Sequence, residues 1–146
     1  MEAALQRRVQ RYGWDNASSY YENSWQQQLK PAHDALFASA KIEAGEKIIY
    51  VACGTGLSTF RALEATGVNG LVLGTDIPDK MVELSAKTAL ENKLFNVTFK
   101  RMDAEELKLP DEEFNVALCA LGLMYVPAPV NALKEMHRVL KPGGRC

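Results

Sequence analysis

Short apolar runs alternate with segments of helical periodicity from Lys47 to the end of the chain. Runs rich in β-branched and aromatic residues predict strands over Lys47–Ala52, Leu71–Asp76, Val97–Met102 and Phe114–Cys119. Helical spacing predicts three buried stripes between and after them: Leu57, Phe60 and Leu63; Val82, Ala86, Ala89 and Leu94; and Val130, Leu133, Met136 and Leu140. Strands that alternate with helices pair in parallel, so the pattern predicts an open α/β sheet covered on both faces.

The residues before Gly45 show helical periodicity only. Leu5, Val9 and Tyr12 recur at helical spacing, and a second helix is predicted from Ser18 to Leu29. Pro31 breaks that helix or opens the next one, over Ala32 to Ala40. The chain is therefore expected to divide into a helical lead, residues 1–44, and an α/β domain, residues 45–146.

Composition and charge narrow the class of partner. The 146 residues are 47% hydrophobic and 24% charged, which is typical of one globular domain. The formal net charge of -1 gives no electrostatic signal for nucleic acid, so a small-molecule partner is expected and nucleic acid is not. The longest apolar run, Val116 to Val126, is too short for a membrane span.

The cysteines and the first residues predict a reducing compartment and no metal. Cys53, Cys119 and Cys146 are widely spaced and lack a nearby histidine, so neither a disulfide framework nor a zinc site is indicated. The opening sequence is amphipathic and carries an acid, without the apolar core of a secretion signal. We expect a cytoplasmic protein.

Candidate ligand-binding residues follow the predicted strands, because ligands of open α/β sheets bind at the carboxyl ends of strands. A glycine loop, Cys53 to Gly56, joins the first strand to a helix N-terminus, where backbone N–H groups face an anion. Asp76 ends the second strand and could accept hydrogen bonds from a ribose diol. Asp103 follows the third and could accept from an adenine amino group. Taken singly, each could also be a turn or a helix cap.

In this order the motifs resemble the class I S-adenosylmethionine-dependent methyltransferases of the small-molecule type, over about Tyr20 to Arg145. Val51–Gly56 (VACGTG) resembles the first motif of that family, Thr75-Asp76 its ribose acid, Arg101–Ala104 its adenine-binding turn and Arg138–Arg145 its closing signature. The resemblance implies a Rossmann-like sheet, S-adenosylmethionine as cofactor with S-adenosylhomocysteine as product, and a small-molecule methyl acceptor. In that family, helices ahead of the first strand often cover the cofactor, so residues 1–44 could form a lid over it, a wall of the acceptor pocket or only a packing layer.

The cofactor-binding residues that the resemblance implies are Tyr20, Ala52, Cys53, Gly54, Gly56, Asp76, Ile77, Met81, Asp103, Ala104 and Leu121. Tyr21 is matched as loosely as Tyr20. No catalytic side chain is implied, because alignment of the acceptor with the sulfonium methyl supplies much of the acceleration. His33 and His137 lack a paired acid or nucleophile, so neither is assigned as a general base.

Two departures from the family are visible. The residue before Val51 is usually an acid there but is Tyr50 here, which predicts weaker cofactor binding or a changed ligand; Asn115 also replaces a common acid. Family members continue after the Pro-Gly-Gly turn into a fifth strand and a hairpin, whereas this sequence ends at Cys146. We therefore expect a domain truncated before its fifth strand, either a fragment or a half-domain. Its fourth strand would be an exposed edge that could form a homo-oligomer.

Two other functions stay open at this point. A nicotinamide-dependent oxidoreductase would also use Gly54, Gly56 and Asp76. Thr59 stands against it, because the dinucleotide fingerprint has Gly or Ala at that position. A cofactor-binding or interaction module without catalysis is compatible with Tyr50 and the early end of the chain. The acceptor itself is left open among lipids, quinones, polyketides, sterols and small amines.

Overall fold

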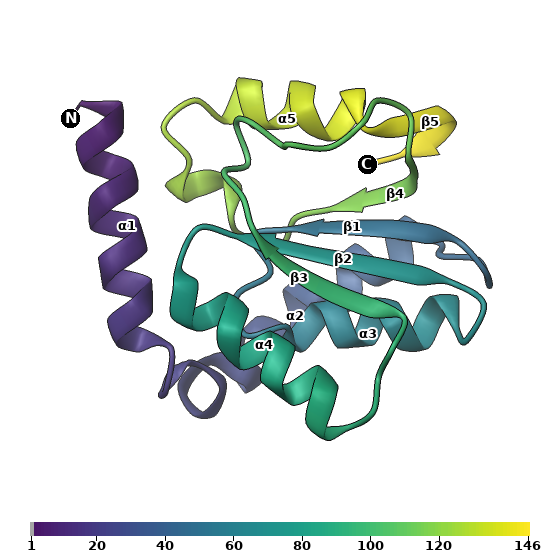
Figure 1. Ribbon diagram of the computed structural model, residues 1–146, viewed down its shortest axis with the longest axis horizontal. Coiled ribbons are helices and arrows are strands. Elements are labelled where there is room, and N and C mark those ends of the chain that lie inside the picture. Colours follow the sequence, from purple (N-terminus) through teal and green to yellow (C-terminus); the bar gives the residue numbers. More distant parts are fainter. Residues whose placement is uncertain (1) are drawn as a thin grey trace.

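The computed structural model describes residues 2–146, except for the side chains of residues 22–24. Its elements, in chain order, are α1 (Ala3–Ala17), α2 (Tyr21–Ala40), β1 (Lys47–Val51), α3 (Leu57–Thr66), β2 (Leu71–Asp76), α4 (Asp79–Glu91), β3 (Val97–Arg101), β4 (Phe114–Leu118), the 3-10 turn η1 (Leu123–Tyr125), α5 (Pro129–Arg138) and β5 (Leu140–Arg145). The strands form one parallel sheet in the order β3-β2-β1-β4-β5 (Figure 1). The predicted α/β fold is confirmed, and the four predicted strands agree with β1 to β4 to within a residue.

The strand order defines where a ligand can bind. β1 pairs with β2 on one side, from Lys47 opposite Leu71 to Val51 opposite Thr75, and with β4 on the other. The chain thus runs outward from β1 to β3 and then returns to add β4 beside β1. Such a reversal opens a crevice at the carboxyl ends of the two central strands.

Two apolar layers cover the sheet. On one face, Ile48 and Tyr50 of β1 pack with Ala62 and Leu63 of α3 and with residues of α2 and α4. On the other face, Ile49 and Val51 pack against α5 and the segment that precedes β4. Figure 1 shows α5 alone above the sheet, with α3 and α4 below it. The central strands are therefore buried on both faces, as parallel strands usually are.

The buried stripes of two helices differ from the prediction. The buried residues of α4 are Met81, Ser85 and Ala89, and Ala86 is exposed. α5 buries Ala132 and Met136, whereas Val130 and Leu133 are exposed, at 62% and 44%. Both errors have one cause: a serine or alanine can occupy the face that approaches the sheet most closely, and a hydrophobicity pattern undervalues such small residues.

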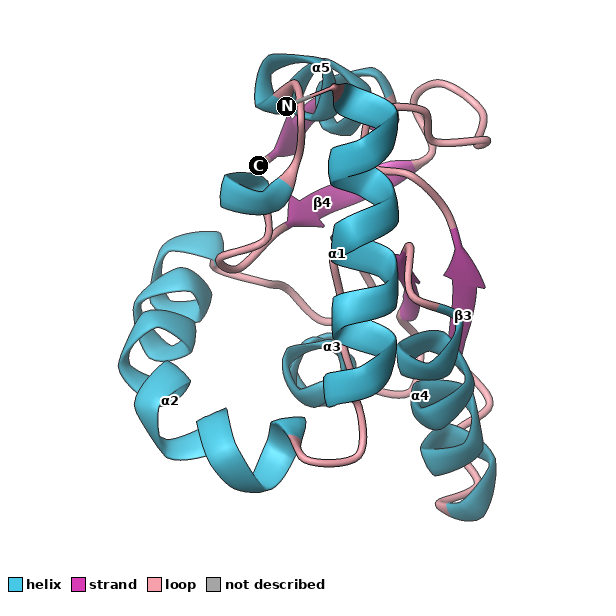
Figure 2. Cartoon of the chain, turned by 90° about the vertical axis from the view of Figure 1, so that its left-hand side faces the viewer, coloured by secondary structure: helices cyan, strands magenta, loops and turns pink. Residues whose placement is uncertain are grey.

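The N-terminal helices differ from the prediction at Pro31. A single helix, α2, runs from Tyr21 to Ala40 through this proline, where a break was predicted. Proline removes one helical hydrogen bond and commonly bends a helix. Figure 2 shows the two halves of α2 running in different directions, with α1 in front of the carboxyl edge of the sheet. The bend lets α2 extend from α3 toward the same edge.

A fifth strand is present, which corrects the prediction of only four strands; truncation of the domain stays a prediction. Leu140–Arg145 pairs in parallel with β4, with a register shift between Phe114 and Val116. The Pro-Gly-Gly sequence, expected as a turn, lies within this strand. Pro142 is tolerated because β5 lies at an edge of the sheet, and Leu140 is anchored in the apolar layer beside α5. β4 is consequently not an exposed edge, which removes the basis for the homo-oligomer predicted there.

Candidate functional site

The glycine loop adopts backbone conformations that require glycine at two positions. Gly54 and Gly56 have φ values of +56° and +89°, in the left-handed region that favours glycine. A Cβ on Gly56 would lie 2.8 Å from Cε2 of Phe60, so a side chain does not fit there. The amide of Cys53 donates to the carbonyl of Thr75 at 3.0 Å, which holds the loop against the end of β2.

Asp76 connects the loop to the end of β2. Its Oδ2 accepts a hydrogen bond from the Gly54 amide at 2.7 Å, and its Oδ1 accepts one from the Ile77 amide at 2.8 Å. Burial raises the pKa of Asp76 to about 6, although the two amides favour the ionised form. A carboxylate has about four lone-pair positions, so after these two bonds Asp76 still has acceptor capacity for a ligand.

Asp103 lies beyond the end of β3 and pairs with the first helix. Its Oδ1 accepts a hydrogen bond from the Glu105 amide at 2.9 Å, and its Oδ2 lies 2.7 Å from Nε of Arg7. Arg7 also pairs with Glu105 at 2.8 Å. This ion-pair group attaches α1 across the carboxyl edge of the sheet.

A cavity of about 210 Å³ lies at this edge, between α1, α2, the glycine loop and the segment from Ala120 to Pro127. The charged side chains among its lining residues are Arg7, Asp76 and Asp103. The rest of the lining is largely apolar or aromatic, and includes Trp14, Tyr21, Trp25, Leu29, Met124, Tyr125, Val126 and Pro127. An apolar cavity with a few polar groups at one end is typical of a small-molecule site.

Most of the site residues predicted from the sequence meet at this cavity. Those that line it are Ala52, Gly54, Asp76, Ile77, Met81, Asp103, Ala104 and Leu121. Cys53 and Gly56 belong to the loop but are buried and do not line the cavity, and burial raises the pKa of the Cys53 thiol well above its usual range. Tyr20 is 72% exposed and does not line the cavity, whereas its neighbour Tyr21 does. Whether these residues bind a cofactor stays a prediction.

Several lining residues were missed by the sequence reasoning. Arg7, Gln10 and Trp14 come from α1, and Tyr125 comes from η1. The spacing of seven residues between Arg7 and Trp14 indicates a shared helix face, but nothing in the sequence shows which face meets the sheet. His33 and His137 are not among the lining residues, and burial lowers the pKa of His33.

The floor of the cavity contains two residues in unusual conformations. Ala52 and Leu121 have φ values of +56° and +59°, although neither is a glycine. Gly122 lies against Ala52, since a Cβ on Gly122 would be 2.4 Å from that of Ala52. Strained backbone of this kind is often found at functional sites.

Tyr50 lies beneath the loop and not in the cavity. Its side chain is buried, and its hydroxyl makes no well-formed hydrogen bond among the described residues, although the Ser58 hydroxyl is close enough to lower its pKa. Burial raises the pKa of Tyr50, so the phenol is neutral. Its effect on cofactor affinity stays a prediction, and any such effect would act through the position of the loop.

Known proteins share this arrangement. A family model described as "Methyltransferase domain" matches residues 48–144, which spans the sheet and the glycine loop. The chain belongs to this methyltransferase family. The predicted resemblance is therefore confirmed at the level of the family, and S-adenosylmethionine is the cofactor of the family.

Individual members of the methyltransferase family match over most of the chain. A demethylmenaquinone methyltransferase of Geobacillus stearothermophilus is 33% identical over 99% of this chain and 63% of its own length. The aklanonic acid methyltransferase DauC of Streptomyces sp. (strain C5) is 31% identical over 90% of this chain and 60% of its own. The chain thus spans less than two thirds of the length of these relatives.

A solved structure broadens the chemistry associated with the methyltransferase fold. The [4+2]-cyclase SpnF is 32% identical to this chain and superposes with a TM-score of 0.73, over 83% of this chain and 44% of its own.

Among residues 2–146 of the present protein, we find no helix that is long and apolar enough to cross a membrane. Among the side chains that the structure describes, no group of three His, Cys, Asp or Glu residues could hold a metal ion.

Proposed function

We propose that this methyltransferase-family chain binds S-adenosylmethionine in the cavity and transfers its methyl group to an apolar small molecule. The observation that carries the proposal is the position of Asp76 and Asp103, at neighbouring strand ends, on one cavity with the glycine loop. S-adenosylmethionine supplies an electrophilic methyl group on a sulfonium sulfur that leaves as a neutral thioether.

The residues present fit this cofactor. Asp76 has free acceptor capacity for ribose hydroxyls, and Asp103 is available to accept from the adenine amino group. Ile77 and Met81 offer apolar contacts for the base between these acids. At Gly54 the missing side chain lets the backbone approach the amino-acid end.

The acceptor is proposed to bind in the apolar part of the cavity. Trp25, Leu29, Met124 and Val126 exclude water there and can hold an acceptor in line with the methyl group. Relatives are named for demethylmenaquinone and aklanonic acid, which supports a quinone or polyketide among the acceptors left open. The α1 and α2 lead would act as a lid over this site. The free thiols of Cys53, Cys119 and Cys146 suit the reducing cytoplasm as its compartment.

A calorimetric titration of the chain with S-adenosylmethionine, S-adenosylhomocysteine and NAD tests the proposal. Binding of the first two alone is expected. Asp76→Asn should weaken their binding by about ten- to a hundred-fold, because it removes a charge-assisted acceptor. The matched control Glu64→Gln changes an exposed carboxylate of α3 and should leave the binding constant unchanged. No binding to the folded chain, or an equal effect of both variants, would contradict the proposal.

A second candidate, cofactor binding without methyl transfer, is favoured by the likeness to a cyclase. Transfer of a labelled methyl group to a panel of quinones, polyketides, sterols and amines separates the two candidates. Transfer to any of them supports the methyltransferase. The nicotinamide alternative is disfavoured, because Thr59 is completely buried at a position where that fingerprint requires Gly or Ala.

A further inference from the structure

Three aromatic rings from three different elements meet in the cavity. Trp14 of α1 makes edge-to-face contacts with Tyr21 of α2, at 5.7 Å between ring centroids, and with Tyr125 of η1, at 5.4 Å. The indole N–H of Trp14 donates to Oε1 of Gln10 at 3.0 Å, which fixes the orientation of the ring. We call Trp14, Tyr21 and Tyr125 the aromatic cluster.

The aromatic cluster lies beside the glycine loop. A Cβ on Gly54 would lie 3.8 Å from Cε1 of Tyr21, an ordinary contact distance, so this ring lies close to the loop. Tyr21 and Asp76 line the same cavity, and burial together with the charge of Asp76 raises the pKa of Tyr21. The cluster therefore borders the part of the cavity where the proposed cofactor would join its adenosine to its amino-acid end.

Both carboxylates that line this cavity already have partners, although each keeps acceptor capacity for a ligand. Asp76 accepts from the amides of Gly54 and Ile77, and Asp103 is paired with Arg7. No charged side chain among the described lining residues comes from α2 or η1. A cation between the glycine loop and η1 would lie beside these three rings, and aromatic rings attract cations to their faces, most strongly in a desolvated site.

We infer that the aromatic cluster makes this chain select the sulfonium form of the cofactor over its thioether product, an inference that rests on the function proposed above. The two forms share adenosine and the amino-acid end and differ in the charge at sulfur. During transfer the electron pair of the S–CH₃ bond stays on sulfur, the acceptor's electron pair forms the new bond to carbon, and the acceptor loses a proton to solvent. The attraction to the rings thus disappears with the charge, which favours release of product and entry of new donor.

The test compares binding constants for S-adenosylmethionine and S-adenosylhomocysteine by calorimetry. The unmodified chain should bind the sulfonium form roughly five- to thirty-fold more tightly. Trp14→Leu and Tyr21→Leu should bring this ratio close to one. Trp14→Phe and Tyr21→Phe keep a ring and should retain most of it. Tyr12→Leu removes an exposed ring of α1 outside this cavity and should leave the ratio unchanged.

The outcomes separate this inference from the proposed function. If both ligands bind the unmodified chain equally well, or if the leucine variants weaken both by the same factor, the charge selection is overturned while cofactor binding stands. If neither ligand binds the folded chain, the proposed function fails and the inference fails with it. If the ratio of the two binding constants falls in the leucine variants but not in the phenylalanine variants, the selection is supported. The phenylalanine variants also show whether a change at these positions by itself prevents folding.

Discussion

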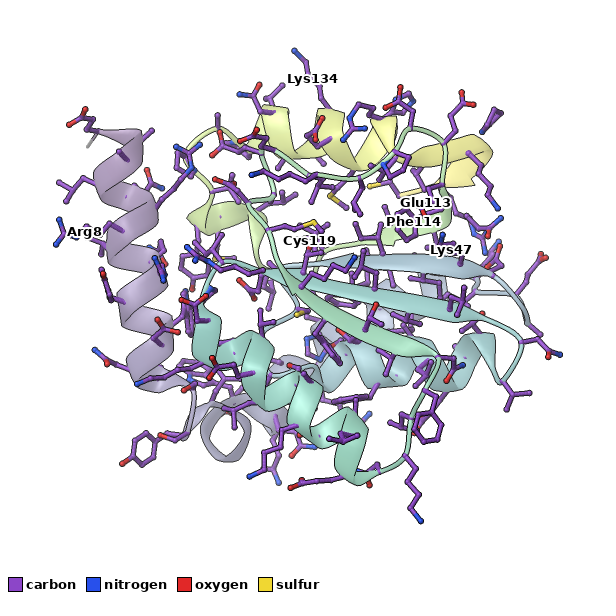
Figure 3. The ribbon with its side chains drawn as sticks, in the orientation of Figure 1. Arg8, Lys47, Glu113, Phe114, Cys119 and Lys134 are labelled. Carbon is purple, nitrogen blue, oxygen red and sulfur yellow. The ribbon has the colours of Figure 1, made fainter. Side chains whose placement is uncertain are left out.

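The contact between Ala52 and Gly122 predicts a strong energetic coupling across the floor of the cavity. Gly122 has φ -82° and ψ -34°, which suits alanine as well as glycine. The obstacle to Gly122→Ala is steric, since the new Cβ would lie 2.4 Å from Cβ of Ala52 and 3.0 Å from Sγ of Cys119. Figure 3 shows Cys119 near the end of β4.

The sizes of the effects follow from these contacts. Gly122→Ala should lower the free energy of unfolding by about 1–3 kcal/mol, as overpacking commonly does. Ala52→Gly removes the strain of an alanine in the left-handed conformation, which is about 1–2 kcal/mol. Glycine also loses more conformational entropy on folding, which costs roughly 0.5–1 kcal/mol, so the net change in the free energy of unfolding is small. In the double variant the clash with residue 52 disappears. A coupling energy of about 1–2 kcal/mol is therefore expected.

Urea denaturation of the four proteins, followed by circular dichroism, measures this cycle. Gly13→Ala is the matched control, because a Cβ there meets nothing within 4 Å and should stabilise α1 by about 0.5–1 kcal/mol. If the effects of Ala52→Gly and Gly122→Ala add to within about 0.5 kcal/mol, the two residues do not share the space inferred here.

Three further predictions concern charge and burial. Arg7→Ala should lower the free energy of unfolding in urea by about 1–2 kcal/mol, because the Glu105 carboxylate, which is 8% exposed, loses its partner. Arg8 is the control, since its side chain points away from the protein (Figure 3), and Arg8→Ala should change this free energy by less than about 0.5 kcal/mol. Affinity for S-adenosylhomocysteine should weaken as the pH falls through about 6, since Asp76 has its pKa raised to about 6 and becomes a poorer acceptor when protonated; calorimetry at successive pH values checks this, and a flat profile would refute it. Tyr50→Phe should raise the free energy of unfolding by about 1 kcal/mol in thermal denaturation, because it removes a buried hydroxyl that makes no well-formed hydrogen bond. A loss of stability would instead show that the contact of this hydroxyl with Ser58 is stabilising.

The sequence is informative where local pattern and global fold demand the same residues. The strands of the sheet core are short runs that are buried on both faces, so their composition identified them directly. The loop at Gly54 and the acids Asp76 and Asp103 were found because their positions are defined relative to strand ends. These residues then meet in space because parallel strands end at one edge.

Features that depend on how distant segments pack were not predictable in the same way. Tyr20 and Tyr21 are adjacent and chemically alike, and the start of α2 alone decides which one faces the cavity. Pro142 looks like a helix end, and only its position at the sheet edge makes it part of a strand. The contribution of α1 to the cavity depends on ion pairs to residues about a hundred positions away, such as Arg7 with Asp103, which no local pattern records.

The way in which α1 is attached has a kinetic consequence. Among residues 3–17 none is fully buried, although Arg7, Gln10 and Trp14 form one wall of the cavity. A wall held mainly by partly exposed ion pairs can separate at a lower free energy than the sheet unfolds. Exchange of a bound molecule then needs only this separation, so its residence time should shorten as ionic strength rises. Because the separation of α1 does not depend on the ligand, ligands of very different affinity should enter the cavity at similar rates.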